Sequence, residues 1–279
     1  MRALALAGLI ALVGAGPAIA NPSSWQREWP DTDFSKTLVD DWSEIVSGGP
    51  PKDGIPALTD PEVIPAARED GLEPQELVIT VDPEGAAAHA YPLRYLMWHE
   101  IANVRIGGRP LAVTYCPLCN SGIVFDRRVD GQVLEFGVSG KLRNSDMVMY
   151  DRQSESWWQQ TTGRGIVGKH TGTKLDKLAI WMESWRSFRE AHPEGRVMAE
   201  PTDHARAYGT NPYRRYDSSE QPFLYSGEMP PGDIDPMSRV VQVGDRAWPL
   251  TRVRAAGEIT EAGVTITWQG GAASPLDAG

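Results

Sequence analysis

The chain has two cysteines, and they stand close together in a Cys-Pro-Leu-Cys knuckle that runs from Cys116 to Cys119. A strand-like run that ends at Tyr115 precedes the knuckle, and Gly122 follows it. Two thiols at this spacing can bind one metal ion, exchange with another disulfide, or form a disulfide with each other. Chemistry is therefore expected first at this knuckle.

A metal site is the first hypothesis. A strand, a Cys-x-x-Cys pair and a small residue after it resemble half of a zinc-ribbon site, in which both thiolates point at one ion. A closed structural zinc site needs four ligands, and the chain has no second pair. Further ligands would come from His99, Met147 or Met149, and such a set suits copper as well as zinc. The sequence predicts a copper or zinc site with Cys116, Cys119 and His99 as ligands.

Thiol–disulfide exchange and a structural disulfide stay open as alternatives. Redox pairs of this spacing normally begin a helix, whereas Gly122 begins a predicted strand. In an exchange reaction the leading Cys116 would attack, and Cys119→Ser would trap a mixed disulfide. In an oxidising compartment the pair can instead close a structural disulfide, in a non-enzymatic binding module. A c-type haem is excluded because Asn120 stands where that motif needs histidine.

Polar residues on either side of the knuckle could complete a site. His99 lies in a helix predicted to begin at Pro92, and Asn103, four residues on, shares its face. His99 is either a ligand or general base, or a packed structural residue. Residues 139–146, which include Lys141 and Arg143, are predicted to form a polar loop that either binds an anion or simply meets solvent. The catalytic candidates are His99, Cys116, Cys119, Arg143 and Asp146.

The N-terminus predicts export. Residues 1–20 combine Arg2, a short apolar run and a small-x-small ending, Ala18 to Ala20, which is the pattern of a cleaved signal peptide. No later run reaches the roughly 20 apolar residues that a membrane helix needs. We therefore expect a periplasmic or secreted bacterial protein that is not inserted in the membrane after signal cleavage.

Composition limits the partners and the fold class. A net charge of -10 argues against nucleic acid, which needs a basic surface. The expected partner is a small ligand or a periplasmic protein, whose identity the sequence leaves open. With 10 Trp, 22 Pro and 28 Gly, the chain is rich in turns and aromatic residues. We predict a mainly β (α+β) fold, a sandwich or barrel-like domain with a few short helices.

Four segments follow from the pattern along the chain. Residues 21–56 form an N-terminal arm, with a short helix near 38–46, and a Gly/Pro loop. Residues 57–206 form the main β-rich domain, which carries the cysteines, and residues 207–279 form a β-rich C-terminal extension. Within the main domain, Asp130-Gly131 predicts a hairpin, and Ser184 predicts the start of a helix that ends before Pro193.

The C-terminal extension echoes part of the main domain. The sequence Ala-Tyr-Pro-Leu at 90–93, followed by Glu-Ile at 100–101, is similar to Ala-Trp-Pro-Leu at 247–250, followed by Glu-Ile at 258–259. The two segments predict a duplicated β unit whose second copy lacks the cysteines, although chance similarity is the alternative.

Residues 33–200 resemble bacterial domain-of-unknown-function family 3179. The resemblance rests on residues 47–58, 90–103, 113–126 and 136–150, and on Trp158-Gln159-Gln160. It implies an exported bacterial protein and assigns no activity. It also implies one shared polar site, made of His99, Asn103, Cys116, Cys119, Asn120, Ser121, Arg143, Asn144, Asp146 and Gln159.

Overall fold

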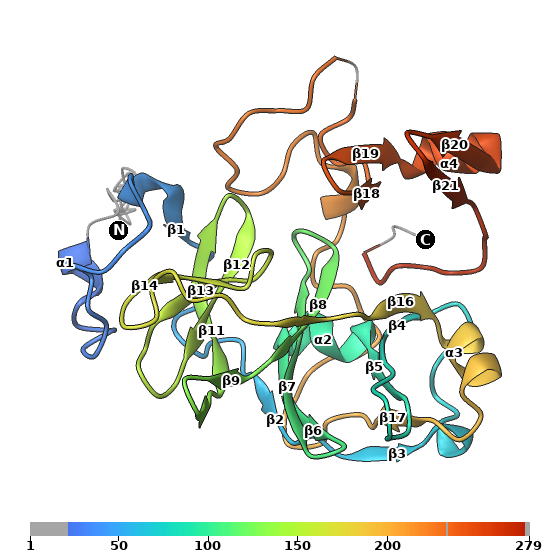
Figure 1. The fold of residues 1–279 in the computed structure, drawn as a ribbon, viewed down its shortest axis with the longest axis horizontal. Helices are drawn as coiled ribbons and strands as arrows, with labels where there is room; N and C mark the ends of the chain where they lie inside the picture. The colour runs from blue at the N-terminus through green and yellow to red at the C-terminus, as the bar shows by residue number, and fades with distance from the viewer. Residues whose placement is uncertain (1–21, 233, 277–279) are drawn as a thin grey trace, which may run out of the picture.

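The fold is mainly β, as the sequence predicts, and is built around three open five-stranded sheets (Figure 1). A computed structural model describes residues 22–232 and 234–276 of the chain. Within these residues no sheet closes into a barrel. The predicted signal peptide, residues 1–20, lies outside the described residues.

The three sheets follow one another across the molecule. The first has the order β1 (Ile45–Ser47), β11 (Phe136–Arg143), β12 (Asp146–Asp151), β13 (Trp157–Gln159), β14 (Arg164–Val167). The second has the order β15 (Lys177–Leu178), β8 (Ser121–Asp126), β7 (Arg109–Cys116), β6 (Ile101–Ile106), β2 (Leu58–Thr59). The third has the order β16 (Trp181–Ser184), β4 (Leu77–Val81), β5 (His89–Pro92), β17 (Arg196–Met198), β3 (Val63–Pro65).

The second sheet is the middle layer, because it shares a core with each of the others. Ala112 of β7 packs in one cluster with Phe136 and Met149 of the first sheet. Val113, the next residue of β7, packs in another cluster with Ile79 of the third sheet. Successive residues of a strand point to opposite faces, so β7 buries both of its faces. The knuckle that follows β7 therefore starts from a rigid support.

Helix α2 (Leu93–His99) begins directly after Pro92, as predicted, but it is shorter than the apolar pattern suggested. Glu100 has a φ of 58°, which ends the helix. Asn103 consequently lies in strand β6, and the prediction that it shares a helix face with His99 was wrong. The second predicted helix is α3 (Trp185–Ala191), and the Ser184 side chain caps it by accepting from the Ser187 N–H.

The N-terminal arm packs against the first sheet through its tryptophans. The rings of Trp25 and Trp29 each lie 5.3 Å from that of Trp157 on β13. The helix predicted near residues 38–46 is wrong: a single 3-10 turn, η1 (Trp42–Glu44), leads into β1. A short helix, α1 (Pro22–Trp25), begins the described chain. Pairing with β11 fixes residues 45–47 as a strand, which local sequence does not reveal.

The polar loop predicted for residues 139–146 is mostly buried strand. Strand β11 continues to Arg143, with a break in register between Val138 and Lys141, and only a tight turn separates it from β12. Gly140 allows the irregularity, with a φ of 72°. The predicted Asp130-Gly131 hairpin joins β9 (Arg128–Val129) to β10 (Gln132–Val133).

The C-terminal extension repeats the order of elements found around the cysteines. There, β4 pairs with β5, then α2 leads to the β6–β7 hairpin. In the extension, β18 (Val240–Val243) pairs with β19 (Arg246–Pro249), then α4 (Leu250–Ala256) leads to the hairpin of β20 (Glu258–Glu261) and β21 (Val264–Thr267). Both helices follow a proline and end at a positive-φ residue, Glu100 or Gly257. The boundary near residue 207 stays a prediction.

None of the helices formed by residues 22–232 and 234–276 combines the length and the apolar character that crossing a membrane requires.

We expect Gly140→Ala to destabilise the protein by about 3 kcal/mol, because a Cβ there would combine positive-φ strain with a backbone clash. The added atom would lie 2.1 Å from the Pro50 carbonyl oxygen. Gly131→Ala is the control, since Gly131 has a φ of 79° but nothing near its Cβ position, and should cost about 1 kcal/mol. Urea unfolding measures both, and equal losses would contradict the close approach of residues 50 and 140.

Candidate functional site

The knuckle is a tight turn between two paired strands. Strand β7 ends at Cys116, which pairs with Ser121 at the start of β8. Inside the turn, the Cys119 N–H donates to the Cys116 carbonyl at 3.2 Å. This turn brings both sulfurs to the same place, with Cys116 buried and Cys119 exposed.

Both cysteines are free thiols in this structure. Their Sγ atoms are 3.1 Å apart, longer than the roughly 2.05 Å of a disulfide bond. Two thiolates on one tetrahedral zinc would be about 3.8 Å apart, given Zn–S bonds of about 2.3 Å. Small side-chain rotations would therefore bring the two sulfurs to the spacing of either a disulfide or a metal-bound pair.

Asp146 joins the two cysteines. It is the first residue of β12 and is 4% exposed. Its Oδ1 accepts from the Cys119 thiol at 3.4 Å, while its Oδ2 accepts from Gln159 Nε2 at 2.6 Å and from the Thr161 N–H at 3.0 Å. Ligand atoms of Cys116, Cys119 and Asp146 all lie within 4.8 Å of one another. Among the described residues these three form a group able to hold a metal ion.

The surroundings keep Cys119 protonated. Its hydrogen bond to Cys116 is the largest cause that raises its pKa. Desolvation of the sulfur comes next, because the sulfur faces Cys116 and Asp146 even though the residue as a whole is exposed, and the Asp146 carboxylate adds repulsion. A raised pKa is the opposite of what activates a cysteine nucleophile. A bound metal ion would reverse this, because a coordinating thiol loses its proton.

The sequence predicted His99 as a ligand together with the two cysteines, but His99 does not belong to the group formed by Cys116, Cys119 and Asp146. It is fully buried, and its Nδ1 donates to the Pro56 carbonyl at 2.7 Å. Its Nε2 accepts from the Tyr208 hydroxyl at 2.6 Å. Both ring nitrogens thus have protein partners, and burial lowers the pKa of His99 to about 4. The structure places His99 as a neutral link between the Gly/Pro loop and the C-terminal extension, and puts Asp146 beside the sulfurs instead.

The remaining predicted residues divide between the site and its support. Gln159 holds Asp146, while Asn103 bonds to backbone groups of Leu58 and Phe136 inside the fold. Arg143 forms an ion pair with Glu44 at 2.7 Å, and Lys141 one with Glu28 at 3.0 Å. These pairs neutralise the two cations predicted to bind an anion. Three others flank the group of three: Asn120 and Asn144 lie in turns, and Ser121 begins β8. Met149 and Met147 share the buried cluster of Cys116.

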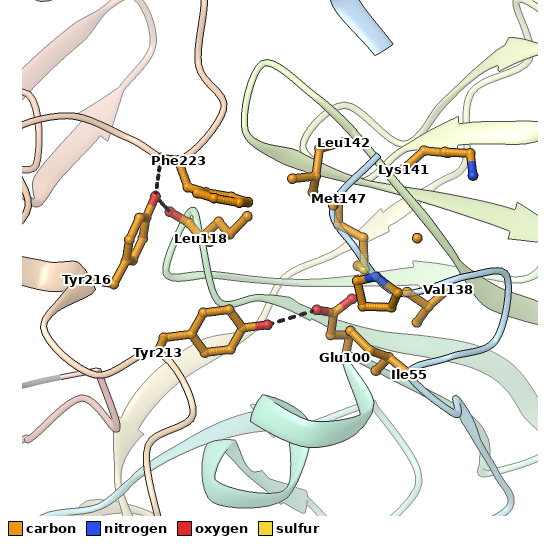
Figure 2. Close-up of a pocket in the computed structure, with 13 residues that line it drawn as sticks. Ile55, Glu100, Leu118, Val138, Lys141, Leu142, Met147, Tyr213, Tyr216 and Phe223 are labelled. Atoms are coloured by element: carbon orange, nitrogen blue, oxygen red, sulfur yellow. Dashed lines mark hydrogen bonds between the residues drawn. The ribbon is translucent and has the colours of Figure 1, made fainter. Parts of the chain in front are cut away.

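A cavity of about 340 Å³ lies beside the knuckle (Figure 2). Leu118, between the two cysteines, lines it, together with Met147, which follows Asp146. Sequence reasoning missed three polar residues of its wall: Glu100, Tyr213 and Tyr216. The tyrosine-rich stretch after residue 206 was visible in the sequence, but its contact with the knuckle, where Tyr216 Oη donates to the Leu118 carbonyl at 3.1 Å, is a tertiary feature.

Residues 52–279 match the family described as "Protein of unknown function (DUF3179)". The chain belongs to this family. The match begins at residue 52, later than the resemblance to residues 33–200, and it extends through the C-terminal extension. The segment with the similar order of elements is therefore part of the DUF3179 region. No curated protein and no solved structure matches the chain. Membership in DUF3179 assigns no activity, which leaves the geometry of the site as the basis for a function.

Glu100 gives the stability of this DUF3179 protein a distinctive pH dependence. Burial raises the pKa of Glu100 to about 8, so the native state keeps a proton that the unfolded state loses near the ordinary value of 4.5. The stability from this proton is complete below pH 4.5 and is lost as the pH rises through 8. His99, with its lowered pKa, acts in the opposite direction and only between about pH 4 and 6.5.

We therefore expect the free energy of unfolding to fall by about 1.5 kcal/mol between pH 6.5 and 8 in the wild type. Glu100→Gln, which keeps the shape but does not titrate, should show little change over the same interval. Urea unfolding at several pH values makes the comparison. A parallel decline in both proteins would show that another group is responsible.

Proposed function

We propose that this protein binds a soft or borderline metal ion through Cys116, Cys119 and Asp146, with zinc favoured over copper. The observation that carries the proposal is the convergence of two thiols and one carboxylate within 4.8 Å. Zinc accepts both thiolate and carboxylate ligands, whereas Cu(I) prefers sulfur alone. The Cys2Asp set therefore fits Zn²⁺ best.

The environment of the group also supports a metal. Ligating carboxylates are usually held by further hydrogen bonds, which fix their orientation. Asp146 has such support, because Gln159 and the Thr161 N–H both donate to the oxygen that faces away from Cys119. Cys119 is exposed, so an ion can enter and a fourth coordination position can face solvent.

We place this activity outside the cytoplasm, in the periplasm or the secreted fraction, on the basis of the signal-peptide pattern at residues 1–20. Thiol pairs in that compartment oxidise unless a metal or a reductant protects them. A bound zinc ion would keep the Cys116 and Cys119 sulfurs reduced there.

The test is metal stoichiometry and affinity in protein purified under reducing conditions. We expect one zinc ion per chain, and thiolate-to-cobalt charge-transfer absorption when Co²⁺ replaces it. Cys119→Ser removes an exposed ligand and should weaken binding at least about 100-fold, more than the 10–100-fold typical of loss of a supporting residue. Chelator competition measures the affinities.

Asn144→Gly is the matched control for the metal test. Asn144 is an exposed residue of the turn before Asp146, and its φ of 52° suits glycine. This variant should bind zinc like the wild type. Absence of stoichiometric metal in the wild type, or equal affinity in Cys119→Ser, would contradict the proposal.

Thiol–disulfide exchange is the second candidate, favoured by the 3.1 Å separation of the two free sulfurs. In such a reaction the dithiol gives two electrons and two protons to a partner disulfide, which becomes two thiols, while Cys116 and Cys119 close a disulfide. Access decides the order: Cys119, on the exposed side of the knuckle, would attack even though its raised pKa slows that step, and the buried Cys116 would resolve the mixed disulfide. This order is the reverse of the one expected from the sequence.

The order of attack can be measured with glutathione disulfide as the partner. Cys116→Ser leaves the exposed thiol and should accumulate a mixed disulfide with glutathione. Cys119→Ser leaves only a thiol that is 1% exposed and should react at least about 10-fold more slowly, because access limits exchange. Mass spectrometry follows both reactions. Equal rates in the two variants would count against an exchange site with this geometry.

A further inference from the structure

The cavity beside the knuckle has an apolar wall and one buried acid. Its apolar lining includes Ile55, Leu118, Val138, Leu142, Met147 and Phe223. Glu100 is 7% exposed, and its carboxyl group points toward Tyr213 across the cavity (Figure 2). The volume of about 340 Å³ falls in the range of small-molecule sites.

Glu100 has no cationic partner among the described residues. None of their ion pairs involves it, and the one hydrogen bond to its side chain comes from Tyr213 Oη at 3.4 Å. Lys141 also lines the cavity, but its ammonium group points away and pairs with Glu28 (Figure 2). A buried carboxylate without a cation is costly, so it takes up a proton instead. The raised pKa of Glu100 reflects this situation.

Three aromatic rings line the same cavity as the acid. Tyr213, Tyr216 and Phe223 all line the cavity and come from one stretch of the C-terminal extension. The Tyr216 hydroxyl connects this stretch to the knuckle, since it donates to the Leu118 carbonyl and accepts from the Phe223 N–H at 3.3 Å. Aromatic rings attract organic cations through their faces, and several rings around one carboxylate are a common arrangement for ammonium groups.

We propose that this cavity binds a small organic ammonium ligand, with Glu100 as its counter-ion and the rings of Tyr213, Tyr216 and Phe223 as its walls. A cationic ligand supplies the positively charged partner that an ionised Glu100 lacks. An anion would find no available cation here, because the nearby Lys141 and Arg143 are already paired with Glu28 and Glu44. A purely apolar ligand would leave the buried acid in its protonated form and gain nothing from its charge. The ammonium site is separate from the metal site and does not depend on it.

The probe is choline, compared with its uncharged isostere 3,3-dimethyl-1-butanol, in titrations of the full chain with a chelator present. The chelator removes any contribution from the metal site, so the two proposals fail independently. We expect saturable choline binding, and at least 10-fold weaker binding of the alcohol. Glu100→Gln should weaken choline binding at least 10-fold and leave the alcohol unchanged.

Two further variants make the result decisive. Glu84→Gln changes an exposed acid in the β4–β5 turn and should bind choline like the wild type. Phe223→Leu, at an exposed position of the wall, removes a ring but keeps apolar bulk, and should weaken choline several-fold without affecting the alcohol. Equal binding of choline and the alcohol, no choline binding by the folded wild type, or undiminished choline binding by Glu100→Gln would each overturn the proposal.

Discussion

The site depends on one buried amide that joins two sheets. Asn103 on β6 is fully buried, and its Nδ2 donates to the Phe136 carbonyl at 2.8 Å while its Oδ1 accepts from the Phe136 N–H at 2.9 Å. Phe136 begins β11, so the pair of bonds fixes the first sheet against the middle one. Because β11 leads through one turn to Asp146, and β7 beside β6 leads to Cys116, this link helps to set the distance between carboxylate and sulfurs. Buried amide–backbone bonds have a defined geometry and are costly to leave unmade.

The parts of the fold that were predicted are those that local chemistry determines. The Asp130-Gly131 hairpin and the helix capped by Ser184 each follow from a few neighbouring residues, and the structure confirms both. Strand β1 and the end of strand β11 were not predicted, because they form strands by pairing with each other, and their residues are about 100 positions apart in the sequence. Residues 139–143 look polar, yet Lys141 is 6% exposed, and its charge is compensated by Glu28, 113 positions away. No local pattern contains that partner.

The candidate site, too, could be predicted only where local sequence determines it. The knuckle was located by its cysteines, which local sequence displays directly. The third member was not assigned as a metal ligand, because His99 is the better soft-metal donor by residue type, and its engagement by Pro56 and Tyr208 is invisible in sequence. Asp146 reaches the sulfurs only because β11 and β12 return to the knuckle. Residue type therefore pointed to the chemistry of the two cysteines, whereas the packing of the sheets determines that Asp146, rather than His99, lies beside them.

Comparison of the two segments with a similar order of elements shows what is unusual about Glu100. In the C-terminal segment the corresponding helix end is Gly257, with a φ of 74°, whereas Glu100 has a φ of 58°. Matched by elements, Glu100 therefore corresponds to Gly257, and the Glu258-Ile259 echo in the sequence is one residue out of step. Glycine accepts this backbone freely, but a side chain there costs about 1 kcal/mol or more. Glu100 bears that strain in addition to the cost of a buried acid, and its carboxyl group lines the cavity beside the cysteines. Strain of this kind gathers where a side chain must be held for binding. The segment around the cysteines thus differs from the C-terminal one not only in its cysteines but in an acid held at a position where glycine would serve the fold.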